Sequence, residues 1–327
     1  MKYNYMEVEQ MKNIVMDLSG YDEGPSIISQ AVKVFLEKSK YVNIYVVGNQ
    51  KDLTPLSKQK NVTCVSAYNE GDIRPSNNDY IYQKSWEAME KSKADVLITP
   101  ADRTTVLKSA ESHLNKIGMP ILITCFLSAN AGRFCFLTDC GANASLSSIQ
   151  YQSMAKEVYL FVKTVFSLSE PKYSLVGSSN EPGDLAEITR DAFDALEGKQ
   201  GFKGITSFNQ ILDGKCDIYL ADGTLSQAII QSMYSIYKVF NDKYVKYQKE
   251  DFRAKISKFF GTAMARDINA TTSAKLDQTG LMLLGYDKFV INSNKTTNTG
   301  GIIATLNNAQ KYLNSLSTEE VEKHLDK

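Results

Sequence analysis

This sequence is poor in the residues on which most metal and redox chemistry depends. Its 327 residues include two histidines, His113 and His324, so we expect neither a histidine-based zinc site nor a Ser-His-Asp triad. The five cysteines show no CxxC spacing, which is typical of buried thiols in a reducing compartment; Cys140 alone lies in a loop that could expose it. We therefore predict no metal and no cofactor, and expect chemistry from backbone amides, carboxylates, hydroxyls and basic side chains.

Net charge and long apolar runs are also lacking. The 37 basic and 37 acidic residues cancel, so no global field favours nucleic acid and we expect no nucleic-acid partner. No apolar stretch approaches the roughly 18 residues that cross a bilayer. The opening segment MKYNYMEVEQ has no apolar core of the kind found in signal peptides. These features predict a soluble, cytoplasmic protein.

Short runs rich in valine and isoleucine recur along the chain, and each ends in small or polar residues. They predict strands at residues 13–17, 43–48, 61–66, 94–99, 120–125, 133–139, 173–177, 217–222 and 288–292. Apolar residues at helical spacing predict helices over 26–38, 80–93 and 150–166. Strands alternating with helices indicate an α/β fold with three α/β/α layers and a mostly parallel sheet, which we expect to form a single domain over 1–327.

Residues 228–274 interrupt this alternation, because only helical patterns occur there. Aromatic residues alternate with lysines along the segment, and we predict a helical hairpin that protrudes from the α/β body. Two interpretations of this hairpin stay open. It packs on its own domain or on a second subunit, or it presents a basic, aromatic tip to an anionic membrane or an acidic partner.

Polar loops follow five of the predicted strands. In parallel sheets, ligands bind beyond the carboxyl ends of strands, where helix N-termini favour anions. The loops are rich in Gly, Asp, Ser, Asn and Thr and cover residues 16–25, 138–143, 176–184, 221–224 and 292–297. Each alone is typical of an ordinary turn, and none contains the GxxxxGK phosphate loop. Gathered at one edge of a sheet, they would suit a small oxyanion held by amides and hydroxyls.

The order of the motifs points to one family. Met16-Asp17 with Gly20, Asp22 and Pro25 is similar to an opening M-D-x-x-G-G-D-x-x-P. The other matching segments are Val46-Val47-Gly48, Asp139-Cys140-Gly141-Ala142-Asn143, residues 213–223 and residues 283–291. Taken together and nearly end to end, the chain resembles the PlsX-type phosphate acyltransferases.

This resemblance implies a fold like that of isopropylmalate dehydrogenase, a homodimer, and transfer of an acyl group from acyl carrier protein to inorganic phosphate. The product would be an acyl phosphate for fatty acid and phospholipid synthesis. The implied catalytic residues are Asn143, Asp222 and Gln227. The candidate substrate- and phosphate-binding residues are Asp17, Gly20, Asp22, Thr104, Gly141 and Gly223, together with two cations, Arg103, which is new relative to the family, and Lys295 in the last loop.

The departures from the family pattern keep other functions open. The loop S-A-G-N-T-G-A falls on residues 99–105 without either glycine, Gln227 replaces an asparagine and Ser226 a glycine. Asp184 stands where a lysine is expected, which inverts the charge beside a phosphate; Arg103 and Lys295 are the cations available to compensate. The alternatives are a non-catalytic homologue that binds a carrier protein or partner enzyme, and a phosphate acetyltransferase-like enzyme that uses coenzyme A.

Overall fold

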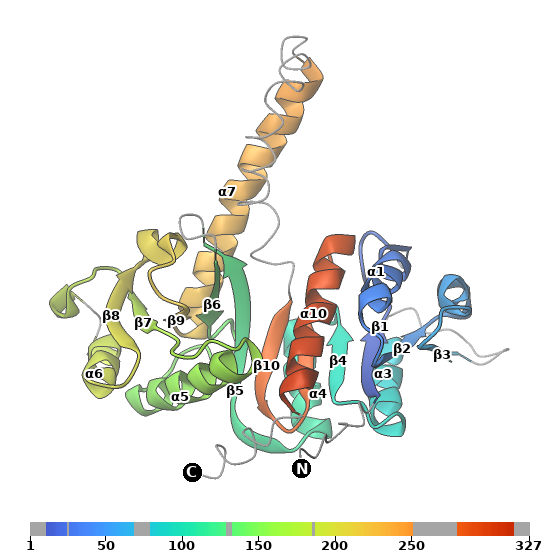
Figure 1. Cartoon of the computed structure of the whole chain (residues 1–327). Coiled ribbons are helices and arrows are strands. Elements are labelled where there is room, and N and C mark those ends of the chain that lie inside the picture. Colours follow the sequence, from blue (N-terminus) through green and yellow to red (C-terminus); the bar gives the residue numbers. More distant parts are fainter. Residues whose placement is uncertain are drawn as a thin grey trace, which may run out of the picture. The chain divides into compact units, whose positions relative to one another are not determined.

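The computed structural model describes residues 11–24, 26–68, 79–128, 133–184, 187–250 and 280–316. They belong to two compact units, which we call unit 1 (Met1–Asn115 with Asp287–Lys327) and unit 2 (Lys116–Tyr286). Each unit combines strands with covering helices (Figure 1). The predicted α/β class with a mostly parallel sheet is confirmed. The prediction of a single domain over 1–327 stays a prediction.

The strands of unit 1 are all parallel to their neighbours. They are β1 (Lys12–Asp17), β2 (Val42–Gly48), β3 (Val62–Ser66), β4 (Val96–Thr99) and β11 (Phe289–Asn292). Their order across the unit is β3-β2-β1-β4-β11. The chain therefore runs outward on one side of β1 and returns to its other side at β4. The loops after β1 and β4 flank this reversal, which is where open α/β sheets bind ligands.

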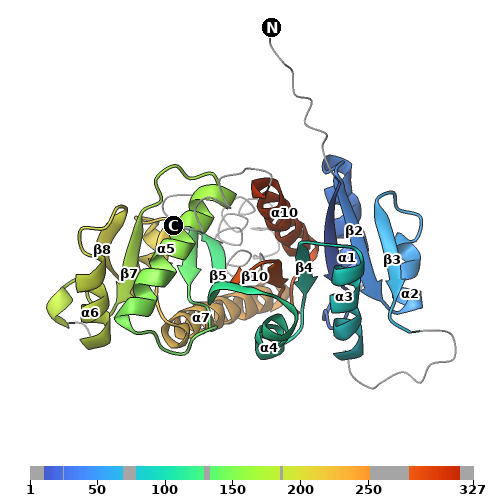
Figure 2. The same ribbon diagram turned by 90° about the horizontal axis from the view of Figure 1, so that it is seen from below.

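Helices cover both faces of the strands in unit 1. They are α1 (Ser26–Lys38), α2 (Gln50–Leu53), η1 (Thr54–Leu56), α3 (Asp79–Lys91), α4 (Arg103–His113) and α10 (Thr299–Ser315). α1 packs against α10, while α3 packs on β1, β2 and β4. Figure 2 shows α3 and α4 on the side of the strands opposite α10. Because both faces are covered, β4 and β11 are buried along their entire length and β1 is buried from Ile14 to Asp17.

Unit 2 combines parallel strands with an antiparallel pair. Its strands are β5 (Lys116–Leu127), β6 (Phe134–Thr138), β7 (Tyr173–Gly177), β8 (Phe202–Ser207), β9 (Ile218–Leu220) and β10 (Leu281–Tyr286). They lie in the order β10-β5-β6-β9-β7-β8. β6, β9, β7 and β8 are parallel, whereas β5 runs antiparallel to both β6 and β10. The carboxyl ends of β6 and β9 are therefore neighbours.

The helical elements of unit 2 follow these parallel strands. They are α5 (Ser148–Val165), η2 (Pro182–Asp184), α6 (Glu187–Leu196), η3 (Phe208–Asp213) and α7 (Gly223–Glu250). α5 begins at a capping box, in which the Ser147 side chain accepts the backbone N–H of Gln150 while the Gln150 side chain accepts that of Ser147. Its buried face packs on β5 and β9 and contacts α6. The cap fixes where the loop after β6 ends.

α7 is a 28-residue helix that extends beyond the strands of its own unit (Figure 1). Its first turns pack beside β6, but farther along the apolar side chains of Tyr234, Ile236 and Val239 are exposed. The predicted helical character of residues 228–250 is thus observed. Residues 251–274 lie outside the described residues, so the hairpin stays a prediction. None of the helices among the described residues has the length and apolar character to cross a membrane.

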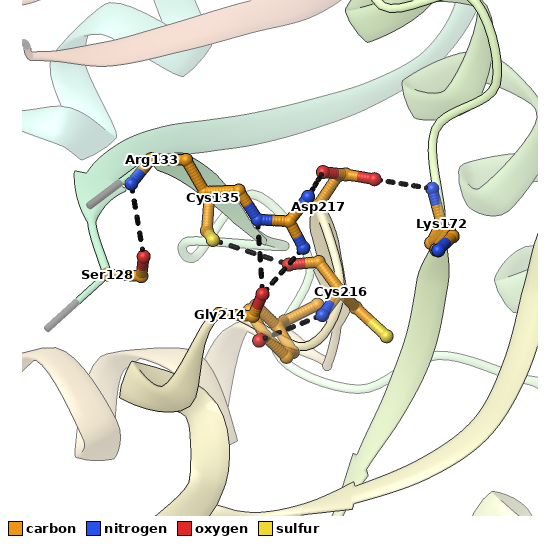
Figure 3. A network of polar contacts seen from close by, with 8 residues as sticks. Ser128, Arg133, Cys135, Lys172, Gly214, Cys216 and Asp217 are labelled. Carbon is orange, nitrogen blue, oxygen red and sulfur yellow. Dashed lines mark hydrogen bonds and ion pairs between the residues drawn. The ribbon is translucent and has the colours of Figure 1, made fainter. Parts of the chain in front are cut away.

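The amino ends of β6, β9 and β7 are joined by a buried carboxylate. Arg133 Nη1 donates to Asp217 Oδ1 at 2.7 Å, and Asp217 Oδ2 accepts the backbone N–H of Lys172 at 2.7 Å (Figure 3). The same guanidinium donates from Nε and Nη2 to the carbonyl oxygen of Gly214. Each of the three strands begins directly after one of these residues. This network stabilises the amino ends of the three strands. The polar loops described below follow the opposite, carboxyl ends.

All nine predicted strands are present, but two further strands, β8 and β10, were not predicted from the sequence. β10 has the sequence LMLLGY, which contains no β-branched residue, and leucine and methionine favour helices. β8 is a half-exposed outermost strand. Four of the five cysteines are buried as predicted, and Cys64 is partly exposed; Cys140, whose loop could have exposed it, is fully buried.

Candidate functional site

A buried aspartate joins the two strands at the chain reversal of unit 1. Asp17 ends β1 and is fully buried. Its Oδ1 accepts the backbone N–H of Ser19 at 2.8 Å and the Ser19 hydroxyl at 2.5 Å, and its Oδ2 accepts the hydroxyl of Thr99 at 2.8 Å. Thr99 ends β4. Asp17 therefore holds the loop after β1 against the end of β4.

Burial makes the ionised form of this aspartate unfavourable. It raises the pKa of Asp17 to about 6, because the bonds from Ser19 and Thr99 that favour the carboxylate only partly offset the loss of water. The folded protein consequently holds a proton on Asp17 more tightly than the unfolded chain does. Protein stability is coupled to this difference in proton binding.

The stability of the protein should therefore depend on pH through Asp17. Between about pH 4 and about pH 6 the folded state binds the extra proton, so the free energy of unfolding should fall as pH rises, by about 3 kcal/mol for two pKa units. Asp17→Asn should remove this fall, because the amide does not titrate. Urea unfolding across this pH range measures it. Asp22→Asn makes the same change on the surface of the same loop; equal profiles for both variants would contradict the role of Asp17.

A third loop, after β11, meets these two. The backbone N–H of Ser293 donates to the carbonyl of Thr99 at 2.8 Å, and the backbone N–H of Asp22 donates to the carbonyl of Lys295 at 3.0 Å. The Lys295 ammonium forms an exposed ion pair with Asp102, 2.9 Å from its Oδ1. Exposed pairs of this kind contribute little stability. An anionic ligand that binds the Lys295 ammonium in place of Asp102 would therefore cost the protein little stability.

The other predicted residues of unit 1 belong to the same loops. Gly20 has a φ of 80°, a left-handed conformation that suits glycine in the tight turn after β1. Arg103 is half-buried in the first turn of α4, where Thr104 is exposed. The predicted residues of unit 1 thus lie at one end of its strands: Asp17 is the last residue of β1, Gly20, Asp22 and Lys295 lie on the loops after β1 and β11, and Arg103 and Thr104 begin α4.

In unit 2, a second buried aspartate organises the loop after β6. Both carboxylate oxygens of Asp139 accept two donors each. Oδ1 accepts the backbone N–H groups of Leu122 and Ala142; Oδ2 accepts the backbone N–H of Asn143 at 2.6 Å and its Nδ2 at 2.8 Å. Burial raises the pKa of Asp139, although these four donors act in the opposite direction.

The first turn of α7 is bonded to this loop. Gly223 N–H donates to the carbonyl of Asn143 at 2.8 Å, and Gln227 Nε2 donates to the carbonyl of Cys140 at 2.8 Å. Asp222 caps α7, because its Oδ1 accepts the backbone N–H of Leu225 at 2.8 Å. The loops after β6 and β9 therefore form one hydrogen-bonded cluster, which contains the predicted residues Asn143, Asp222, Gln227, Gly141 and Gly223.

Two residues that organise these clusters were not among the predicted site residues. Asp139 entered the sequence-based prediction only as part of the motif with Asn143, and Thr99 only as the end of a strand and the start of the loop 99–105. A buried polar residue at the last position of an apolar strand is the pattern that Thr99 shares with Asp17, and it could have identified Thr99. The side chain of Asp184 lies outside the described part of the structure, so its predicted effect stays a prediction.

Within the described ranges, no three His, Cys, Asp or Glu side chains gather as a metal site requires. Each unit therefore has loops at the carboxyl ends of its strands that are held by a buried aspartate, Asp17 in unit 1 and Asp139 in unit 2. In unit 1 these loops also carry the exposed cation Lys295. This arrangement defines an α/β protein of the doubly wound class that presents its ligand-facing loops at the carboxyl ends of parallel strands.

The sequence comparison gives the family. The chain belongs to the family described as fatty acid synthesis protein, whose model matches residues 12–319. It is 22% identical over 314 residues to a phosphate acyltransferase of Staphylococcus epidermidis, covering 92% of this chain and 95% of the relative. It is 22% identical over 319 residues to a phosphate acyltransferase of Helicobacter hepaticus, covering 93% and 94%.

Solved structures share the fold. A branched-chain phosphotransacylase from Enterococcus faecalis superimposes with a TM-score of 0.60 at 13% identity, covering 92% of this chain and 98% of that one. A phosphotransacetylase from Streptococcus pyogenes gives a TM-score of 0.56 at 14% identity, covering 92% and 94%. At these identities the likeness establishes the fold alone.

Proposed function

We propose that this protein is a phosphate acyltransferase, which transfers an acyl group from acyl carrier protein to inorganic phosphate. The observation that carries this proposal is the family match over residues 12–319, together with relatives named phosphate acyltransferase that align along nearly their full length. A phosphate oxygen attacks the thioester carbonyl and forms the new C–O bond. The C–S bond breaks, and the leaving sulfur takes up the proton that hydrogen phosphate gives up, so the thiol leaves with the carrier. The reaction needs no covalent enzyme intermediate and no cofactor.

The protein then has two tasks, which are to align the reactants and to stabilise the negative charge that develops on the carbonyl oxygen. We assign phosphate binding to the loops of unit 1, where Lys295 forms an exposed ion pair with Asp102 and where Arg103 and Thr104 begin α4. Asp17 is fully buried and serves as a positioning residue for these loops.

Asn143, Asp222 and Gln227 take positioning roles in this proposal. Both N–H bonds of the Asn143 side chain are used, one to the carbonyl of Pro120 at 2.8 Å and one to Asp139. Asn143 therefore has no side-chain donor left for an oxyanion. Asp222 caps α7, and Gln227 uses one N–H on the carbonyl of Cys140. These side chains hold the loop after β6, and the backbone of that loop is the group that would face substrate.

We further propose that the protein works in the cytoplasm as a homodimer and that α7 contributes to contacts outside its own unit. The exposed apolar side chains Tyr234, Ile236 and Val239, interspersed with Lys238 and Lys243, support this role. Such a surface suits a second subunit or an anionic membrane.

A direct assay tests the proposed reaction. Purified protein is incubated with phosphate and either acyl-acyl-carrier-protein or acyl-coenzyme A, and released thiol and hydroxylamine-reactive acyl phosphate are measured. We expect both products in equal amounts with the carrier-protein substrate, and only when phosphate is present. Turnover with coenzyme A alone would instead support the phosphotransacetylase-like alternative. Binding of the carrier protein without turnover would support the non-catalytic alternative.

A further inference from the structure

A cleft lies in unit 1 away from the strand-end loops. α3 packs on β1, β2 and β4, while β3 is the outermost strand of the unit (Figure 2), and a cleft lies between α3 and the β2–β3 strands. The cleft has a volume of about 390 Å³, within the range of small-molecule sites. We call it the α3–β3 cleft. Its lining residues are Tyr45, Thr63, Val65, Ser66, Ala67, Tyr80, Lys84, Glu87, Ala88, Lys91 and Ser92.

The sheet side of the cleft presents the apolar surface of Tyr45, Val65 and Ala67 beside the hydroxyls of Thr63 and Ser66. Tyr45 on β2 pairs in register with Thr63 on β3, and Val65 lies two residues further along the same strand, so these three side chains share one face. On the helix side, the lining includes the small side chain of Ala88 and the ring of Tyr80. Tyr80 is fixed there because its ring stacks on Tyr68, with centroids 5.1 Å apart. An apolar body of several carbon atoms fits against this surface.

The helix side of the cleft carries an excess of positive charge. Lys84 is held by both oxygens of Glu87 at 2.9 Å, so their charges cancel. Lys91 lies 3.6 Å from the same carboxylate, and its side chain is 79% exposed. Loose exposed pairs contribute little stability, so the ammonium of Lys91 can turn to a ligand without a large penalty. The three side chains together carry one net positive charge.

We propose that the α3–β3 cleft binds a small amphiphilic anion, with its apolar body against Tyr45, Val65 and Ala88 and its anionic head at Lys91. The cleft is lined by the sides of β2, β3 and α3 and contains none of the residues assigned to the acyl transfer. The proposal therefore stands apart from the proposed function and can succeed or fail without it. A carboxylate and a phosphate monoester would both satisfy this chemistry.

Isothermal titration calorimetry with octanoate, octyl phosphate and octylammonium tests the proposal on the full-length protein. We expect saturable binding of octanoate and octyl phosphate and none of octylammonium. The three compounds share the same octyl chain, and only the positively charged head of octylammonium is repelled by the net positive charge of the lining side chains. The tighter of the two anions identifies the preferred head group. Equal binding of octylammonium, or the absence of a saturable site for either anion, would overturn the proposal.

Variants locate the site within the chain. Lys91→Glu changes the net charge of the lining side chains from positive to negative and should weaken octanoate binding at this site at least tenfold. Thr63→Trp fills the cleft from an exposed strand position and should remove one saturable site without changing charge. Lys51→Glu makes the same charge change on α2, outside the cleft, and should keep the affinity within twofold. Thermal melts check that each variant is folded. Unchanged octanoate binding in both Lys91→Glu and Thr63→Trp would refute the site.

Discussion

Gly223→Ala should lower the free energy of unfolding by about 3 kcal/mol or more, and should abolish any acyl transfer. Gly223 opens α7 and is buried against the loop after β6. A Cβ at this position would overlap the carbonyl oxygen of Asn143 and lie 2.7 Å from the Cα of Gly141. Both are backbone atoms, so no side-chain rotation can relieve the overlap. Either the loop or the first turn of α7 has to move.

Gly183→Ala is the matched control for this effect. Gly183 lies on an exposed turn of the same unit, and a Cβ there has no atom within 4 Å. We expect a change within about 0.5 kcal/mol for this variant. Urea unfolding followed by circular dichroism measures both. Equal stabilities for the two variants would show that the contact between Gly223 and the loop is not maintained in solution.

Asp139→Asn should destabilise the protein by about 3 kcal/mol. The substitution keeps the size of the side chain but turns one acceptor oxygen into an N–H donor. Each oxygen of Asp139 faces two N–H donors, so whichever oxygen is replaced, two donors lose their acceptor and meet another donor. The loop that contains Asn143 should then rearrange. Chemical denaturation gives the loss of stability, and the acyl transfer assay gives the loss of activity.

Asp222→Asn separates this structural effect from a chemical one. Asp222 accepts one backbone N–H as the cap of α7, and asparagine caps helices as well as aspartate does. We expect stability within about 0.5 kcal/mol of the parent. A large loss of activity at unchanged stability would place the carboxylate of Asp222 in contact with the reactants. A loss of stability equal to that of Asp139→Asn would contradict the capping role.

Most of the parallel strands could be predicted because they are buried on both faces and are built from β-branched residues. β1 and β2 are examples, since each is a short apolar run that ends at a polar or glycine-containing loop. β10 could not be predicted in the same way, because its leucines and methionine favour helices and its strand conformation depends on pairing with β5. Tertiary contact overrides local preference at this strand.

The positions of the site loops could be predicted from the sequence, but the bonds made by their side chains could not. Asp17 and Thr99 are separated by 82 positions, and no local pattern shows that one accepts the hydroxyl of the other. Asn143 has the residue type expected of an oxyanion donor. The fold instead directs both of its N–H bonds to Pro120 and Asp139. Residue type indicates which chemistry is available, and only the surrounding backbone determines where it is used.

α7 has a mechanical consequence for the loop that its first turn holds. A continuous helix of 28 residues measures roughly 42 Å at 1.5 Å per residue. In its first turns, the side chain of Gln227 donates a hydrogen bond to the carbonyl of Cys140. A rod anchored at one end acts as a lever. A small tilt of its distant end turns the anchored end by the same angle, and the bonds from Gly223 and Gln227 pass that rotation to the loop after β6. A partner that binds the distant end of α7 and tilts the helix would therefore exert a torque on residues 140–143.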